Sequence, residues 1–185
     1  MCRRERQLDM SAFASVANMK DLFPQFKPSK IKITIRKVPF LARPFQKFEL
    51  FRKAGKIIRE KDYAKNVFCD AGRLALLKGM AGEAPGEVTY LALGDSIATP
   101  DKLDVKLGNE LYRRLITLKQ ASVLTFSSST FIPSNEGSYA YKEIGLFGGS
   151  AAAVKDSGAL FTHLAINETK SSSESMTIDY DIIAS

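Results

Sequence analysis

The side chains able to do acid–base or nucleophilic chemistry are few in this 185-residue sequence. Its single histidine, His163, lies in an apolar run typical of a strand, where a lone histidine is more often a hydrogen-bonded packing residue than a general base. Glu110, Glu143 and Asp181 could supply the two carboxylates of a glycoside hydrolase, but a chain of this length offers many such triples. No Gly-x-Ser-x-Gly nucleophile elbow is present. We therefore expect no catalytic residues and no enzymatic activity.

The residues that could bind a metal, a phosphate or a cofactor are equally sparse. One histidine and two distant cysteines, Cys2 and Cys69, supply too few ligands for a zinc site and do not form a disulfide framework. Cys69 is expected to be a small buried hydrophobe. The turn at residues 94–96 lacks the further glycines and the lysine of a phosphate-binding loop. We expect no metal and no cofactor.

Most of the chain around these residues has strand-like patterns. Residues 88–93 form an apolar-rich run that a Gly-Asp turn closes. Strands that follow one another without alternating helices favour an antiparallel β-sandwich. Five more strands are expected, at 116–126, 130–132, 139–147, 159–166 and 176–183. The residues expected to be buried in the core are Leu91, Leu93, Leu146, Phe147, Phe161 and Ile178.

Two stretches favour short helices. Residues 70–82 are rich in Ala and Leu, with Asp70 as a fair N-cap and glycines where the helix would stop. Residues 107–116 carry leucines spaced by four, which indicates a short amphipathic helix leading into a strand. We expect Glu143 to pair with Arg113 or Arg114 and so to tie this helix to a strand.

Three phrases stand out because they occur together in one chain. They are Leu-Ala-Leu-Gly-Asp-Ser at 91–96, Leu-Gly-Asn-Glu-Leu-Tyr-Arg-Arg at 107–114 and Glu-Ile-Gly-Leu-Phe at 143–147. As a set they resemble a widespread group of tailed-bacteriophage virion proteins, among them tail-fibre, baseplate and decoration-type components. The resemblance continues into residues 65–73 and 176–183 but leaves out residues 1 to 45. It implies a non-enzymatic assembly protein and transfers no catalytic residue.

Charge is divided unevenly along the chain. Residues 1–65 carry a net charge of +11 and residues 66–185 a net charge of −4, which together give the overall +7. We therefore expect two parts, a basic N-terminal arm at 1–45 and a β-sandwich domain at 46–185. The predicted fold is mainly β, an antiparallel β-sandwich with one or two short helices and an extended basic N-terminal arm. The arm could lie against an acidic partner, or it could be an ordinary solvated charged face.

The residues of the arm that could bind a partner follow two strand-like patterns. Residues 31–37 alternate isoleucine with polar residues, which is typical of a half-buried edge strand, and residues 45–52 have no clean polar side. An edge strand can pair with a neighbouring subunit through its backbone. The candidate partner-binding residues are Ile31, Ile33, Ile35, Arg36, Phe45 and Phe48.

Three classes of function are consistent with the sequence. We favour a virion structural component of the tail, baseplate or fibre attachment, which docks on other virion proteins and on copies of itself through its basic N-terminal arm and is assembled in the host cytoplasm. A capsid decoration protein is the alternative within the same class. A nucleic-acid-binding protein is a further alternative, although no recognised nucleic-acid motif is present. A small hydrolase has the least support. No run of eighteen apolar residues exists, so we expect no membrane partner.

Overall fold

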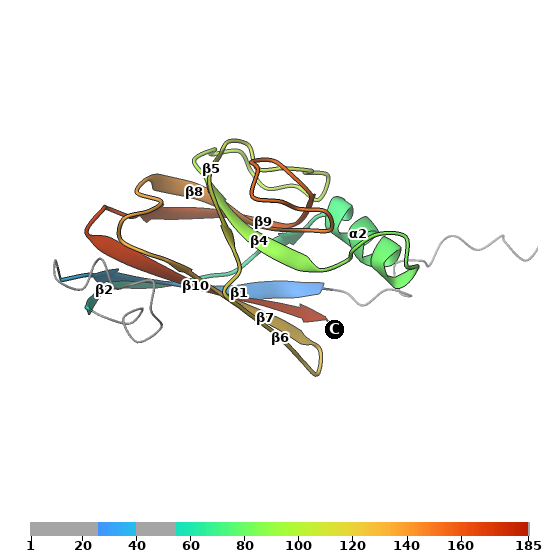
Figure 1. Ribbon diagram of the computed structural model, residues 1–185, viewed down its shortest axis with the longest axis horizontal. Helices are drawn as coiled ribbons and strands as arrows, with labels where there is room; N and C mark the ends of the chain where they lie inside the picture. Colours follow the sequence, from blue (N-terminus) through green and yellow to red (C-terminus); the bar gives the residue numbers. More distant parts are fainter. Residues whose placement is uncertain (1–25, 40–54, 185) are drawn as a thin grey trace, which may run out of the picture.

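Ten strands form two antiparallel sheets in the computed structural model, which describes residues 26–39 and 55–184 (Figure 1). In spatial order, the first sheet holds β2 (Lys56–Tyr63), β1 (Phe26–Lys37), β10 (Glu174–Ala184), β7 (Thr125–Ile132) and β6 (Leu118–Ser122). The second sheet holds β3 (Val67–Phe68), β9 (Ala159–Thr169), β8 (Ala140–Gly148), β4 (Val88–Gly94) and β5 (Glu110–Leu115). The predicted mainly-β antiparallel architecture is confirmed.

The main core lies between the two sheets. Strand β10 shows why it forms, because its alternate residues Met176, Ile178, Tyr180 and Ile182 are all buried while the intervening carboxylates face outward. All six residues predicted to be buried are at most 1% exposed. Five of them belong to this main core, whereas Phe147 points to the other face of the second sheet.

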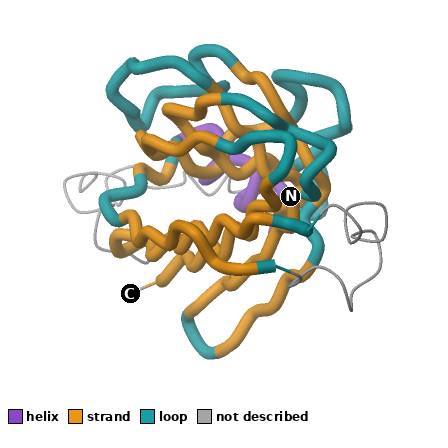
Figure 2. The backbone as a smooth tube through the Cα atoms, turned by 90° about the vertical axis from the view of Figure 1, so that its left-hand side faces the viewer, coloured by secondary structure: helices purple, strands orange, loops and turns teal. Residues whose placement is uncertain are grey.

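A smaller apolar cluster covers the outer face of the second sheet. It consists of Cys69, Ala92, Leu107, Phe147 and Leu160. Leu107 belongs to the loop at 95–109. Ala151, which belongs to the loop at 149–158, packs against the cluster. Figure 2 shows loops gathered on the outer side of one layer of strands. The second sheet is therefore buried on both faces, by the first sheet and by its own loops.

Helix α2 (Asp70–Met80) is the one helix within the described residues and packs against β9. A side chain at Gly72 would collide with the backbone of Phe161, so glycine permits this close approach. The predicted helix is confirmed, but its N-cap is Cys69, and Asp70 instead pairs with Arg73 in the first turn at 3.0 Å. The N-cap role predicted for Asp70 is wrong.

Strand β1 corrects the prediction of a separate arm. It pairs with β10 on one side and β2 on the other, so its backbone is hydrogen-bonded on both edges within this chain. Its isoleucines at 31, 33 and 35 are buried in the main core. The alternating pattern predicts this strand correctly, but the strand lies inside the sheet and belongs to the sandwich. The rest of the predicted arm, residues 1–25 and 40–45, and the boundary expected near residue 45 lie outside the described residues.

The helix predicted at 107–116 is also wrong. Residues 110–115 form β5, which pairs with β4. The leucines spaced by four do not share a face, because Leu107 is buried in the outer cluster, Leu111 packs on the main core and Leu115 is exposed. Their spacing by four therefore does not reflect a helix.

The strand predicted at 116–126 is divided between two strands and a turn. Strand β5 passes into β6 through only Ile116 and Thr117. Ile116 donates its amide hydrogen to the Thr89 carbonyl in the second sheet, and Thr117 donates to the Ser129 carbonyl in the first. This corner carries the chain from one sheet to the other. Strand β6 then turns back at Val123-Leu124 to form a hairpin with β7.

Candidate functional site: two loops held by buried charges

The three phrases noted in the sequence meet at one place in the structure. They supply strands β4, β5 and β8, and β4 lies between the other two. Its last residue, Gly94, is aligned with Glu110 on one side and with Glu143 on the other. The point where the phrases converge is the base of the 95–109 loop, so their polar residues are brought together there.

Glu143 is the centre of this site. Its carboxylate is fully buried and accepts hydrogen bonds from the amides of Ser96 at 3.3 Å, Gly108 at 3.0 Å and Asn109 at 2.8 Å. These donors lie at the two ends of the 95–109 loop. One carboxylate therefore holds both ends of the loop against β8.

His163 extends the network to the middle of the same loop. Its Nε2 lies 3.0 Å from Glu143 Oε2 and its Nδ1 lies 2.7 Å from Asp104 Oδ2. Carboxylate oxygens only accept hydrogen bonds, so both ring nitrogens must donate, and only the imidazolium form can satisfy both partners. The ring is buried, as predicted for a packing histidine.

The pKa values of this pair follow from competing effects. Burial opposes the charged form of each group, but the hydrogen bonds outweigh it. Those from His163 and from the Asn109 and Gly108 amides hold the pKa of Glu143 below its ordinary value. Those to Glu143 and Asp104 raise the pKa of His163 above its ordinary value. The two groups therefore stabilise each other as an ion pair.

Each phrase contains a glycine that this packing requires. A Cβ at Gly94 would collide with Glu143 Oε1, and one at Gly108 would collide with the Ser96 hydroxyl. A Cβ at Gly145 would lie 2.7 Å from a methyl carbon of Leu160, which is closer than a real Cβ contact. The packing of the site therefore requires glycine at these three positions, because a larger residue would displace the loop or β8.

A second buried pair holds the 149–158 loop. Arg113 Nε lies 2.7 Å from Glu110 Oε1, and both side chains are almost fully buried. The guanidinium also lies 4.2 Å from the ring centroid of Phe147 and donates to the carbonyls of Ala152 at 3.2 Å and Ser157 at 2.8 Å. Arg113 thus joins β5 to the loop through its two carbonyl hydrogen bonds, while Glu110 and Phe147 hold the guanidinium in place.

The tips of the two ordered loops are apolar and exposed. The first loop presents Ile97, Leu103 and Val105, of which Ile97 is 88% exposed, and the second presents Val154. The loops are linked to each other, because Lys155 Nζ donates to Asn109 Oδ1 at 3.2 Å. The Asp156 amide donates to Glu110 Oε2 and so ties the second loop to the start of β5. We call these four exposed residues the loop-tip surface.

The pairing predicted for Glu143 is wrong. Its partner is His163, while Arg113 pairs with Glu110 and Arg114 pairs with Glu136. The prediction failed because it rested on a helix at 107–116 facing β8. In the strand that forms instead, Glu110 lies close enough to Arg113 for a bidentate pair.

The three carboxylates considered for glycoside hydrolysis are not brought together. Glu110 and Glu143 lie in the second sheet and are buried in satisfied networks, whereas Asp181 lies on β10 in the first sheet. Within residues 26–39 and 55–184, no group of three or more His, Cys, Asp or Glu side chains is placed to hold a metal ion. Cys69 is buried, as predicted, and burial raises the pKa of its thiol to about 12.

Four of the six residues predicted to bind a partner lie in β1, and three of these four are buried. Ile31, Ile33 and Ile35 lie in the main core, and Arg36 donates to the Gly55 carbonyl at 3.5 Å. Phe45 and Phe48 lie outside the described residues.

Sequence reasoning missed Asp104 and Asn109, whose partners are distant in sequence. The one usable signal in the sequence is a glycine within two residues of a carboxylate in each phrase.

Comparison with known proteins gives no relative: no family model, no curated protein and no solved structure matches the chain. In the part of the chain that the structure describes, no helix has the length and apolar character needed to cross a membrane.

Proposed function

We propose that this chain is a non-enzymatic structural component of a tailed-bacteriophage virion, in the tail, baseplate or fibre attachment, and that it docks on a neighbouring virion protein through the loop-tip surface. The virion assignment rests on the resemblance of the three phrases. The observation that carries the docking role is that these phrases order two loops with apolar, exposed tips.

The energetics of the buried charges support this proposal. A sandwich does not need such pairs for stability, because apolar residues of similar volume often stabilise a core as well or better. Glu143, His163, Glu110 and Arg113 instead fix the positions of loop backbones through directed hydrogen bonds. Fixed loops lose little conformational freedom when a partner binds, so their exposed aliphatic side chains can contribute fully to affinity.

Part of the positive charge predicted for an N-terminal arm lies instead in and beside two neighbouring strands of the first sheet. Within residues 26–39 and 55–65 there are nine Lys and Arg and two Asp and Glu, and these residues include the neighbouring strands β1 and β2. Every residue of β2 but Tyr63 is exposed. This basic sheet edge is a second contact surface, suited to an acidic neighbour.

The test begins with purified particles of the phage that encodes the chain. Quantitative mass spectrometry against the major capsid protein should find it at a few to a dozen or so copies per particle, whereas hundreds would indicate the decoration protein. Absence from the particle would refute the proposal. Ile97→Asp and Leu103→Asp should fold normally by circular dichroism yet fail to enter particles. Met80→Asp, at an 85% exposed position on α2, is the matched control.

Nucleic-acid binding is the alternative that the basic edge favours. Phosphate contacts make affinity fall steeply with salt, so duplex DNA should be titrated at two salt concentrations. If the wild-type chain binds DNA with an affinity that falls steeply with salt, and Lys32→Glu and Lys56→Glu abolish this binding, nucleic-acid binding would be favoured over the docking role.

A further inference from the structure

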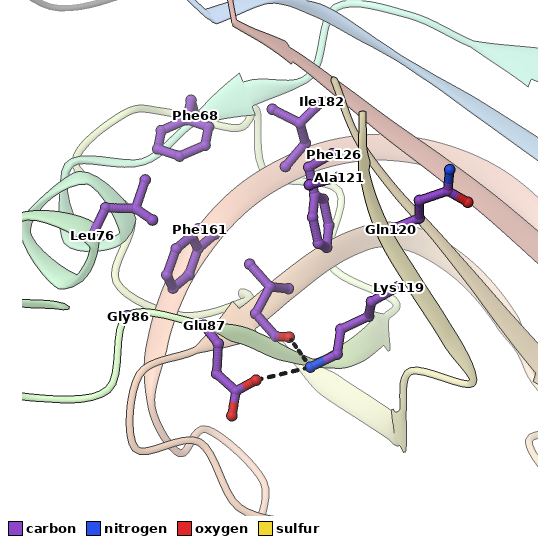
Figure 3. A pocket seen from close by; sticks show the side chains of 11 residues that line it. Phe68, Leu76, Gly86, Glu87, Lys119, Gln120, Ala121, Phe126, Phe161 and Ile182 are labelled. Carbon is purple, nitrogen blue, oxygen red and sulfur yellow. Dashed lines mark hydrogen bonds and ion pairs between the residues drawn. The ribbon is translucent and has the colours of Figure 1, made fainter. Parts of the chain in front are cut away.

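A cavity of about 470 Å³ opens between the two sheets, bounded by α2 and β9 on one side and by the β6–β7 hairpin on the other (Figure 3). Phe68, Leu76, Phe126, Phe161 and Ile182 give it a largely apolar wall. At its rim, Lys119 Nζ lies 3.0 Å from Glu87 Oε2 and donates to the Val88 carbonyl at 3.0 Å. Because the rim charges are already paired, the cavity suits an uncharged aliphatic group.

The hairpin beside this cavity ends in an exposed apolar tip. Ser122 and Thr125 are its last paired residues, which leaves Val123 and Leu124 as a two-residue loop. Val123 is 99% exposed and Leu124 is 60% exposed. The hairpin projects from the body of the molecule in Figure 1.

The backbone at the tip is strained. Val123 has a φ of 52°, in the left-handed region that two-residue hairpin loops normally fill with Gly, Asn or Asp. A β-branched residue there is disfavoured, and its side chain contacts little within its own chain. Folding of the single chain does not account for valine at this position, whereas a contact with another molecule does.

We propose that the Val123-Leu124 tip of one copy inserts into the cavity of a second copy of this chain. Tip and cavity match in polarity, and the cavity volume falls in the lower part of the roughly 300–1,000 Å³ range of binding pockets. Since Ala121 lines the cavity and Val123 lies two residues beyond it, the tip of each copy starts at the mouth of its own cavity. Two copies can therefore exchange tips reciprocally across a two-fold axis.

Substitutions at the tip separate this role from folding. Val123→Gly relieves the strained φ, so it should weaken self-association and yet raise the melting temperature measured at a concentration where the wild-type chain is monomeric. Leu124→Asp should weaken self-association by about tenfold or more, as expected for a buried anchor residue, and leave that melting temperature unchanged. Sedimentation equilibrium of the full chain gives the dissociation constant. Leu115→Asp, at a 60% exposed position on β5 outside the tip, the cavity and the loop-tip surface, is the control that should not change it.

A crosslink identifies the occupant directly. In a Cys2→Ser background, Val123→Cys and Leu76→Cys place one thiol on the tip and one on the cavity wall, and mild oxidation should give a covalent dimer that neither single variant gives. A monomer-sized disulfide would mean that the tip reaches its own cavity and would overturn the proposal. So would a chain that stays monomeric at about 100 μM. All these readouts use the purified chain, so they remain valid whether or not the chain is a virion protein.

Discussion

At the scale of single residues, His163 makes the stability of the chain depend on pH. Its folded pKa is raised above the ordinary 6.5, so its contribution is complete below about pH 6.5 and is lost as pH rises through the folded value. The pKa of Glu143 is lowered below the ordinary 4.5, so its contribution is complete above about pH 4.5 and is lost as pH falls through the folded value. The pair contributes most between these limits.

The expected result is a melting temperature that declines on the alkaline side of this window. The measurement is thermal unfolding of the wild-type chain and of His163→Gln from pH 4 to 10. The glutamine variant should be less stable near pH 5.5, and the difference between the two chains should shrink as pH rises. A constant difference across the range would show that folding does not shift the pKa of His163.

Leu146 provides a residue-scale test of the core. Its side chain is fully buried in the main core, so Leu146→Ala should cost about 2 to 5 kcal/mol in the free energy of unfolding. The matched control is Leu115→Ala on β5, where the leucine is exposed and the same substitution should cost about 0.5 kcal/mol or less. Urea unfolding of both variants gives the comparison, and equal costs would contradict the placement of β8.

At the scale of elements, the sequence predicted the strands with clear alternation and failed where alternation was absent or misleading. Strand β10 was predicted correctly because one face of it is buried and its residues alternate, whereas β8 and β9 were predicted correctly as apolar runs bounded by turn-forming residues. Strand β2 was missed because nearly all its side chains are exposed, which leaves no apolar period. For β5 the sequence predicts a helix because Leu107, Leu111 and Leu115 are spaced by four, although the three leucines lie in different environments in the structure.

The site was predictable only in part for a related reason. The histidine was correctly interpreted because a buried imidazole in a strand needs hydrogen-bond partners. Its partner Asp104 is 59 positions away, in a loop whose path depends on the packing of the whole second sheet. Local pattern carries no information on such a contact.

Removal of β1 tests the corrected domain boundary. A chain that begins at residue 40 lacks the three buried isoleucines and leaves the edges of β2 and β10 unpaired, so it should show no cooperative thermal transition. A chain that begins at residue 26 retains every described strand and should keep the transition. A folded chain from residue 40 would restore the separate arm of the original prediction.

At the scale of the whole molecule, the outer cluster makes the 95–109 loop a cover over Cys69. The thiol is fully buried and lies 3.8 Å from the Asp101 carbonyl within that loop. In a Cys2→Ser chain, a thiol reagent should therefore react with Cys69 only when the loop opens or the protein unfolds.

This reactivity can be compared between variants at one pH. The labelling rate at pH 7 should rise in His163→Gln, because Asp104 loses its buried partner, while Val154→Asp should leave the rate unchanged. Equal rates in all three chains would mean that the loop does not depend on the buried charges.

The corner at Ile116-Thr117 connects the two proposed contact surfaces, the loop-tip surface and the Val123-Leu124 tip, through a short stretch of backbone. From Glu110 to Ser122 the chain is strand except for this two-residue corner, and each corner residue is hydrogen-bonded to a different sheet. Glu110 anchors one loop through Arg113, and Ser122 carries the hairpin tip. A displacement of the tip can therefore reach β5 and the base of the loops along a backbone with no loop in it, although β7, which pairs with β6, shares the force. Neighbours bound at the tip and at the loops would be coupled through β6 and β5.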